Sequence, residues 1–286
     1  MLNATVVIVR VKTIDIPTEE ALTELVALQH TSEKFKNIVK VEWFIGLLCN
    51  FSCTYCAEHV TSGFGIDEKI KRAADLLVQR AGHREIRLLL GGGEPSIHPD
   101  IIEIVKHIHE RGVFLSMISN GSRSPQLYVE MLKHIRYYTF SIHFEQKYQR
   151  TIDTILAVQA KLTELAVKEE VSSRGMQANI MMVPGYFHEA RETIALMEKN
   201  EIPYIIRMIP QLFGKDNKPI LNDRIKDRKV YERSNRHPEI VASDYGYYSH
   251  EELQFLESCL FKVDQNTIEY WEDSSGNISR VESNAN

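Results

Sequence analysis

Three of the four cysteines in this 286-residue chain lie close together, in the segment Cys49-Asn50-Phe51-Ser52-Cys53-Thr54-Tyr55-Cys56. The C-x3-C-x2-C spacing places three thiolates on one short loop, and such a loop can wrap a compact iron–sulfur cubane. Three protein ligands for four irons leave one iron open, and an open position can bind a substrate or a cofactor. The spacing therefore predicts an iron–sulfur cluster at Cys49, Cys53 and Cys56.

Other interpretations of these cysteines stay open at this point. A structural zinc site usually has four ligands and paired C-x2-C motifs, so His59 or the remote Cys259 would have to complete it. A C-x2-C redox pair would leave the third cysteine without a role. A purely electron-transferring cluster would need a fourth ligand. The alternative from another functional class is thus a non-catalytic zinc-binding or interaction module that uses the same three cysteines.

A second motif, Gly91-Gly92-Gly93-Glu94-Pro95, follows the apolar segment Leu88-Leu89-Leu90. Consecutive glycines carry no side chains, so a ligand can approach their backbone closely. Glu94 then offers a carboxylate that suits an ammonium group. By itself the motif fits equally well a glycine-rich turn with an exposed glutamate.

Periodic segments on both sides of these motifs predict strands that alternate with helices. The expected strands are residues 39–45, 85–90, 113–119, 137–143, 177–183 and 204–209. The expected helices between and after them are residues 66–81, 99–108, 126–134, 151–166 and 188–200. Strict alternation implies parallel strands joined by right-handed crossovers.

Six such units are too few for a closed eight-stranded barrel. We therefore expect an α/β fold, a partial (incompletely closed) parallel (β/α)6 barrel with N- and C-terminal extensions. Ligands of such folds bind at the carboxyl ends of the strands. Because the cysteine loop (residues 46–56) and the glycine loop (residues 91–95) both follow strands, both should lie at that edge.

The expected domains are an N-terminal extension (1–38), a core (39–215) and a C-terminal extension (216–286). In the first extension we expect a β-branched run at 5–11 and a helical stretch at 19–27. In the last we expect a loop at 215–236, a helix at 249–261 capped by Ser249, and a hairpin of 267–271 with 278–281. The end directly after the hairpin leaves open that a C-terminal auxiliary-cluster region is missing.

Taken together, the two motifs resemble the radical S-adenosylmethionine (radical SAM) superfamily. Its hallmark is a C-x3-C-x-aromatic-C loop after the first core strand, with a GGE(P) motif one βα unit later. Here the matching residues are Cys49, Cys53, Tyr55 and Cys56, followed by Gly92-Gly93-Glu94-Pro95. The resemblance covers about residues 39–212.

The resemblance implies a 4Fe–4S cluster on the three cysteines and S-adenosyl-L-methionine chelated to the fourth iron. It implies that the Gly92–Gly93 backbone and Glu94 receive the methionine amine, and that main-chain groups of Tyr55 hold the adenine. Candidates for the ribose or carboxylate are Ser119, Asn120 and Ser141, with Asn179 and Arg207 as looser ones. For Ser119, Ser141 and Asn179, a half-buried polar residue bonded to backbone is an equal alternative.

By the same resemblance, the chain is expected to cleave S-adenosylmethionine reductively to a 5′-deoxyadenosyl radical that abstracts hydrogen from a substrate. No catalytic residue is assigned beyond the cluster ligands. The segment 91–100 and the C-terminal segment favour a ribosomally made peptide as substrate, with a small metabolite or nucleotide-derived precursor second. A flavodoxin- or ferredoxin-like protein is the expected electron donor.

Composition limits the remaining possibilities. Hydrophobic residues make up 43% and charged residues 26% of the chain, as in an ordinary globular protein. A net charge of −5 gives no general attraction to nucleic acid or to an anionic membrane, so neither is expected as a partner. No apolar run approaches the roughly 20 residues that cross a bilayer, and no signal peptide is recognisable. We expect a cytoplasmic protein in which Cys259 is a buried free thiol.

Overall fold

The main body of the molecule is a seven-stranded sheet in the order β1-β2-β3-β4-β5-β6-β7. The computed structural model describes residues 9–12, 37–56, 63–167, 175–208, 224–225, 231–232, 245–246, 248–260, 269–272 and 278–281. The strands are β1 Val9–Lys12, β2 Ile38–Phe44, β3 Glu85–Gly91, β4 Phe114–Ser119, β5 Tyr137–Ile142, β6 Gly175–Met182 and β7 Tyr204–Met208. All six neighbouring pairs are parallel.

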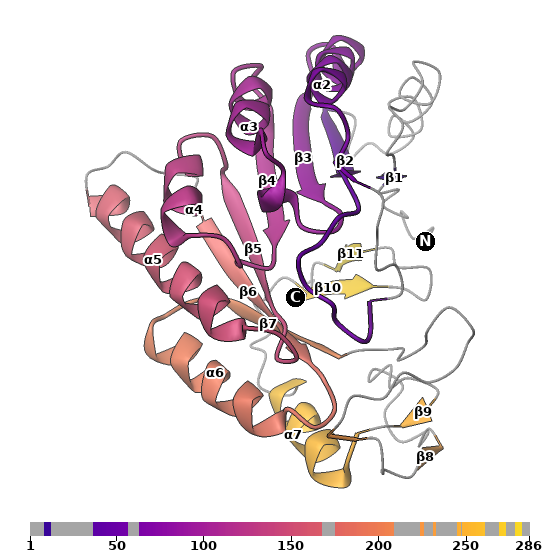
Figure 1. Ribbon diagram of the computed structural model, residues 1–286, viewed down its shortest axis with the longest axis vertical. Helices are drawn as coiled ribbons and strands as arrows, with labels where there is room; N and C mark the ends of the chain where they lie inside the picture. The colour runs from indigo at the N-terminus through magenta and orange to yellow at the C-terminus, as the bar shows by residue number, and fades with distance from the viewer. Residues whose placement is uncertain are drawn as a thin grey trace, which may run out of the picture.

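Helices connect the strands from β2 onwards. They are α2 Asp67–Ala81, α3 Ile101–His109, α4 Pro125–Met131, α5 Tyr148–Val167 and α6 Phe187–Lys199, with a short 3-10 helix η3 at Pro95–Ile97. When strand order follows chain order and every crossover has the same hand, all helices fall on one face of the sheet. Figure 1 shows α2 to α6 arranged along the outside of the curved sheet.

The sheet is not closed by hydrogen bonds: within the described residues, β1 and β7 are its two edges. The expected partial parallel barrel with six βα-type core strands, β2 to β7, is therefore confirmed. The seventh strand, β1, lies in the predicted N-terminal extension and pairs in parallel with β2, from Val9↔Val41 to Lys12↔Phe44. The extension thus adds a strand to the core sheet.

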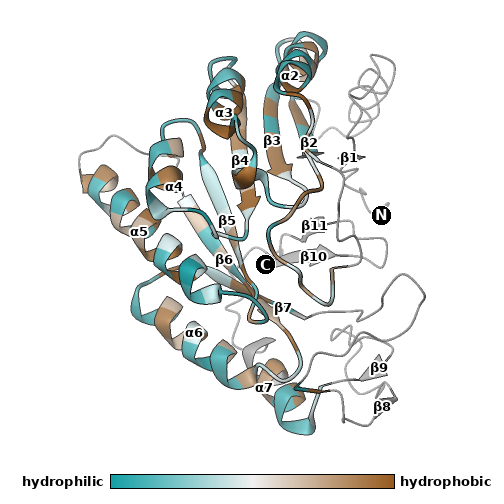
Figure 2. Cartoon of the chain, viewed as in Figure 1, coloured by the Kyte–Doolittle hydropathy of each residue, from teal (hydrophilic) through white to brown (hydrophobic). Residues whose placement is uncertain are grey.

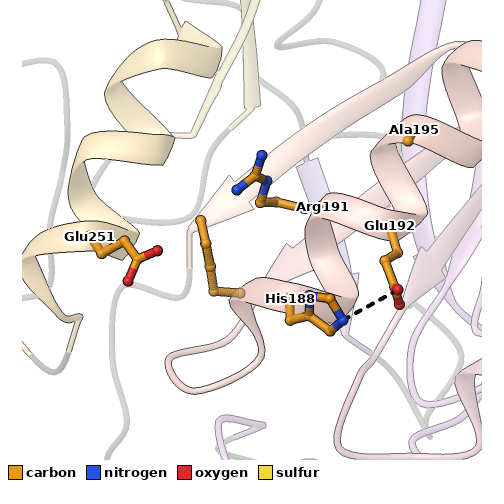
Figure 3. Close-up of a pocket in the computed structure, with 6 residues that line it drawn as sticks. His188, Arg191, Glu192, Ala195 and Glu251 are labelled. Atoms are coloured by element: carbon orange, nitrogen blue, oxygen red, sulfur yellow. Dashed lines mark ion pairs between the residues drawn. The ribbon is translucent and has the colours of Figure 1, made fainter.

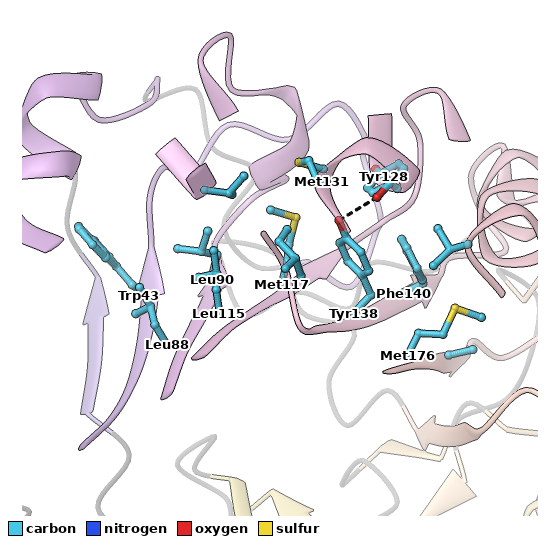
Figure 4. Packing of buried hydrophobic residues seen from close by; sticks show 14 of the residues in the cluster. Trp43, Leu88, Leu90, Leu115, Met117, Tyr128, Met131, Tyr138, Phe140 and Met176 are labelled. Carbon is cyan, nitrogen blue, oxygen red and sulfur yellow. Dashed lines mark hydrogen bonds between the residues drawn. The ribbon is translucent and has the colours of Figure 1, made fainter. Parts of the chain in front are cut away.

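The core lies between the sheet and its helices, because alternate strand residues point to that side. Figure 4 shows this packing, with Trp43, Leu88, Leu115 and Met117 side by side along the sheet. The apolar faces of the helices turn towards the same layer (Figure 2). The residues between these apolar positions, such as Glu42 on β2, point to the concave side of the sheet.

The C-terminal part contains α7 His250–Leu260 and two antiparallel pairs, β8 Tyr231–Glu232 with β9 Tyr245–Gly246 and β10 Glu269–Glu272 with β11 Ile278–Val281. The predicted hairpin and the Ser249 cap are confirmed. Ser249 Oγ accepts from the Glu252 N–H (3.2 Å), and Glu252 Oε2 accepts from the Ser249 N–H (2.6 Å), which is a capping box.

Some expectations differ from the structure. Helix α4 ends at Met131 rather than at residue 134, and strand β6 begins at Gly175 rather than at residue 177. Strand β8 falls inside the segment predicted as a loop at 215–236, because a two-residue pairing is too short to show periodicity. Helix α5 begins at Tyr148 rather than at residue 151. The helix expected at 19–27 lies outside the described residues. Each of the helices that the structure describes is too short or too polar to cross a bilayer.

Candidate active site

The cysteine loop and the glycine loop meet at the carboxyl edge of the sheet, as predicted. They follow the neighbouring strands β2 and β3, whose register ends at the pair Phe44↔Gly91. Two backbone hydrogen bonds join the loops: the Gly93 N–H donates to the Gly46 carbonyl (3.1 Å) and the Glu94 N–H to the Leu48 carbonyl (2.9 Å). The start of the cysteine loop is therefore held by the backbone of the glycine loop.

This approach explains why residues 92 and 93 are glycines. Gly92 has φ +124°, and a Cβ there would overlap with the Gly46 carbonyl oxygen. A Cβ on Gly93 would overlap with the carbonyl oxygens of Leu47 and Leu48. The sequence argument attributed the glycines to the approach of a ligand, whereas the observed requirement is the approach of one loop to the other.

Glu94 is a buried carboxylate, 1% exposed, that ties three segments together. Its Oε1 accepts from the Ser96 N–H (2.9 Å) and the Ser119 hydroxyl (2.8 Å), and its Oε2 accepts from the Asn120 N–H (2.5 Å). Burial raises the pKa of Glu94, although these hydrogen bonds act in the opposite direction. Since two carboxylate oxygens have about four acceptor positions, Oε2 keeps capacity for a further donor.

Ser119 and Asn120, at the end of β4, both support this carboxylate. Besides donating to Glu94, the Ser119 hydroxyl accepts from the Gly121 N–H (3.1 Å) and lies 2.9 Å from the Tyr128 hydroxyl. The Ser119 proton is thus used on Glu94, and the Gly121 N–H occupies one of its two acceptor positions. Its predicted contact with S-adenosylmethionine stays a prediction, and the observed bonds favour a role in positioning Glu94.

The three cysteines are free thiols that differ in exposure: Cys53 is buried, Cys49 is intermediate and Cys56 is exposed. Burial raises the pKa of Cys49, and it raises that of Cys53 to about 12 with a further contribution from the charge of Glu145. Asn120 Nδ2 lies 3.8 Å from Cys49 Sγ and donates to Asn50 Oδ1 (3.0 Å). The end of β4 thus also contacts the first cysteine.

The second half of the cysteine loop is held by residues just after β5. Glu145 accepts from both the N–H (2.8 Å) and the hydroxyl (2.6 Å) of Thr54. The Tyr55 hydroxyl lies 2.5 Å from His143 Nδ1, and the two rings stack. The ring of Phe51 meets that of His143 edge-on.

His143 is neutral in this setting, because burial lowers its pKa to about 4. Burial also raises the pKa of Tyr55 well above its ordinary range, so the tyrosine keeps its proton. Both groups are therefore uncharged, and the Tyr55 hydroxyl and His143 Nδ1 share one hydrogen bond. The side chain of Tyr55 is thus engaged with β5, and its predicted main-chain role towards adenine stays a prediction.

Two further candidates lie side by side on the concave face. Ser141 on β5 and Asn179 on β6 are partners in the strand register and are 8% and 5% exposed. Their neighbours Phe140 and Ile180 belong to the core on the opposite face. Within the described residues, Asn179 Oδ1 is buried and has no hydrogen-bond partner. A buried carboxamide oxygen of this kind suits a donor from a bound ligand.

Sequence reasoning missed Glu145, His143 and Thr54. An acidic residue two positions after a predicted strand, at the same edge as the cysteine loop, was the available signal for Glu145. Nothing local links it to Thr54, which lies 91 positions earlier. Arg207 lies on β7, while His59 and the side chain of Cys259 fall outside the described residues.

A surface pocket lies elsewhere, between α6 and α7 (Figure 3). It is lined by Phe187, His188, Arg191, Glu192, Ala195 and Glu251. His188 and Glu192 form an ion pair (3.3 Å) in which both side chains are mostly exposed. None of the candidate site residues borders this pocket.

The donor set at the sheet edge fits a 4Fe–4S cluster with one open iron. Three thiols lie on the loop after β2, and the buried carboxylate of Glu94, with spare acceptor capacity, follows β3. The unpartnered carboxamide oxygen of Asn179 lies on β6 of the same sheet. Among the described residues, no three His, Cys, Asp or Glu side chains converge on a single metal ion. Nothing in the site supports the zinc alternative.

The chain is similar to several known proteins. It is 38% identical over 81 residues to a GTP 3′,8-cyclase of Rhodopirellula baltica, covering 26% of this chain and 22% of that protein. It is 25% identical over 156 residues to a PqqA peptide cyclase of Methylorubrum populi, covering 48% and 39%. The aligned region thus spans well under half of each of these relatives.

Among solved structures, Streptococcus suis SuiB bound to S-adenosylmethionine matches with a TM-score of 0.46 and 15% identity, covering 68% of this chain and 44% of SuiB. The family model of the radical SAM superfamily matches residues 43–197, which include both loops and the strands that carry them. Enzymes of this superfamily use a 4Fe–4S cluster and S-adenosylmethionine. Since the match extends over more than half of its residues, this chain belongs to the radical SAM superfamily.

Proposed function

We propose that this chain cleaves S-adenosylmethionine reductively at a 4Fe–4S cluster bound by Cys49, Cys53 and Cys56. The 5′-deoxyadenosyl radical that results abstracts a hydrogen atom from a substrate. The observation that carries the proposal is the joining of the cysteine loop to the glycine loop by two backbone hydrogen bonds. They bring the three thiols and Glu94 to one edge of the sheet.

In this proposal the residues around the thiols bind and orient S-adenosylmethionine. The free acceptor position of Glu94 Oε2 and the backbone of Gly92 and Gly93 receive the methionine amine. Ser119 and the Asn120 N–H hold the Glu94 carboxylate in place. Main-chain groups of Tyr55 hold the adenine.

On the concave face, Ser141 and Asn179 contact the ribose or the carboxylate of S-adenosylmethionine. The buried, unpartnered Oδ1 of Asn179 supports this assignment. Asn120, whose Nδ2 is 3.8 Å from Cys49 Sγ, follows β4, which lies between β3 and β5 in the sheet.

As substrate we infer a ribosomally made peptide. The similarity to a PqqA peptide cyclase, which extends over 48% of this chain, supports this class. The similarity to a GTP 3′,8-cyclase is higher in identity but covers 26% of this chain, and it makes a nucleotide the second candidate. A flavodoxin- or ferredoxin-like donor supplies the electron, and the compartment is the cytoplasm.

The test is anaerobic. The full chain is reconstituted with iron and sulfide, reduced with dithionite and mixed with S-adenosylmethionine, and 5′-deoxyadenosine is measured by mass spectrometry. The proposal predicts 5′-deoxyadenosine from the wild type and none from Cys53→Ala. Wild-type protein that contains iron and sulfide but neither binds nor cleaves S-adenosylmethionine would contradict it. Bound zinc without sulfide would favour the metal-module alternative.

A further inference from the structure

Glu145, three residues after the end of β5, contacts the cysteine loop through two hydrogen bonds. Its two carboxylate oxygens accept one hydrogen bond each from Thr54, from the N–H at 2.8 Å and from the hydroxyl at 2.6 Å. Thr54 lies in the turn that the hydrogen bond from the Cys56 N–H to the Cys53 carbonyl (3.1 Å) closes. A single carboxylate therefore fixes the position of the turn between two of the three cysteines.

The hydrogen bond to the Thr54 N–H has a second consequence. Backbone N–H groups in cluster-binding loops can donate to cluster or cysteine sulfurs, and such bonds help to set the reduction potential. In this chain the Thr54 N–H donates to Glu145 instead. The carboxylate also brings a negative charge to the residue next to Cys53, and negative charge opposes the addition of an electron.

The rest of the loop has independent support. Tyr55 is hydrogen-bonded to His143, Phe51 packs against the same imidazole, and the Cys49 end is bonded to the glycine loop. Removal of the Glu145 charge should therefore leave the loop folded, so its electrostatic effect can be measured.

We propose that Glu145 is a positioning residue that holds the Cys53–Cys56 turn and lowers the reduction potential of the bound cluster. This inference rests on the proposed function, because it requires a 4Fe–4S cluster on these cysteines. The step concerned is the uptake of one electron by the oxidised cluster from a one-electron donor, and Glu145 exchanges neither a proton nor a bond. A lower potential gives the reduced cluster more driving force to reduce the sulfonium of S-adenosylmethionine.

The first test is a redox titration of reconstituted wild type, Glu145→Gln, Glu145→Ala and Glu145→Asp, followed by the electron paramagnetic resonance signal of the reduced cluster. Glu145→Gln keeps the shape of the side chain and removes its charge, so its midpoint should shift to a more positive value. Glu145→Ala also frees the Thr54 N–H and should shift at least as far. Glu145→Asp restores the charge and should return towards wild type. Glu130→Gln, at an exposed position of α4, is the matched charge-removal control and should not shift.

The second test needs no cluster. Hydrogen exchange of the peptide around Thr54 is measured by mass spectrometry in the apo-protein. Glu145→Ala should exchange at least about tenfold faster than wild type, since a local opening equilibrium governs the rate. Glu130→Gln should exchange at the wild-type rate.

An unchanged midpoint in Glu145→Gln and Glu145→Ala overturns the proposal, and so does unchanged exchange around Thr54. If the wild type assembles no 4Fe–4S cluster, the proposed function fails and this inference fails with it. A loaded wild type whose potential does not respond to Glu145 overturns this inference alone.

Discussion

At the Cys49 end of the cysteine loop, two backbone hydrogen bonds come from the glycine loop, and exposed or partly buried side chains after β4 add contacts to Cys49 and Asn50. At the Cys53–Cys56 end, the contacts come from the side chains of Glu145 and His143 after β5. The first kind of contact depends on the absence of side chains at residues 92 and 93. The second depends on the presence of two particular side chains.

This difference predicts different tolerances. A backbone contact between two loops that already touch cannot accept an added Cβ without moving one of them. A side-chain contact can be shortened, neutralised or removed while the backbone stays in place. The first end should therefore be sensitive to any substitution at its glycines, whereas the second should respond in graded steps.

Gly92→Ala should have the largest effect. The positive φ is strained for alanine, and the Cβ would overlap with the Gly46 carbonyl oxygen, so we expect a loss of about 4 kcal/mol or more in the free energy of unfolding. Urea unfolding of the apo-protein measures it. Gly112→Ala is the matched control, because φ is +76° but the space around a Cβ is open, and it should cost about 1–2 kcal/mol. Equal losses in the two variants would show that contact between the loops is not the reason.

Glu94→Ala should have the next largest effect. The change leaves the Ser96 N–H, the Asn120 N–H and the Ser119 hydroxyl without their buried acceptor. We expect a loss of about 3 kcal/mol, since each unsatisfied buried donor costs about 1–3 kcal/mol and the site relaxes in part. A loss below about 1 kcal/mol in urea unfolding would mean that water replaces the carboxylate.

The same residue predicts a pH dependence. Because burial raises its pKa, folded Glu94 keeps its proton to a higher pH than the unfolded chain does. The resulting stabilisation is complete below the ordinary carboxyl pKa of about 4.3 and is lost as the pH rises through the raised pKa. Glu94→Gln has no carboxyl group at this position, so its stability does not change with this titration. As the pH rises through this interval, the Tm of Glu94→Gln should increase relative to the Tm of the wild type, and above the interval the difference between the two should stay constant. A difference in Tm that is the same at every pH would contradict the raised pKa of Glu94.

Tyr55→Phe tests the side-chain end. The ring can still stack on His143, but the buried imidazole Nδ1 loses its hydrogen-bond partner, so we expect a loss of about 1–2 kcal/mol in the free energy of unfolding. Tyr137→Phe, whose hydroxyl donates to Gln177 at 3.3 Å in a partly exposed position, is the control and should lose less. Thermal unfolding of both apo-proteins gives the comparison, and a larger loss for Tyr137→Phe would argue against the His143 contact.

Asn50→Ala should have the smallest effect. Asn50 donates to Ser122 (2.8 Å) and accepts from Asn120 (3.0 Å), and it is exposed to solvent. Water can take both places, so we expect a loss of about 0.5 kcal/mol in thermal unfolding. A loss as large as that of Tyr55→Phe would show that side chains matter as much at the Cys49 end as at the other.

The amino-acid sequence alone predicted the alternation of strands and helices, the partial barrel and the meeting of the two loops at one edge of the sheet. These features follow from local periodicity and from the rule that parallel strands present their carboxyl ends together. It also predicted the cap at Ser249, and the spacing of the three cysteines and Glu94 predicted a site whose ligands stay a prediction. The sequence did not predict the first residue of α5 or the two-residue pairing of β8 with β9.

Only the tertiary structure decided which groups hold each end of the cysteine loop. Glu145 reaches Thr54 across 91 positions, and Ser119 reaches Glu94 across 25. Such contacts depend on where separate loops arrive in space, and no local pattern in the chain records that. The reason for Gly92 and Gly93 belongs to the same class, since the carbonyl groups that exclude a Cβ come from another loop.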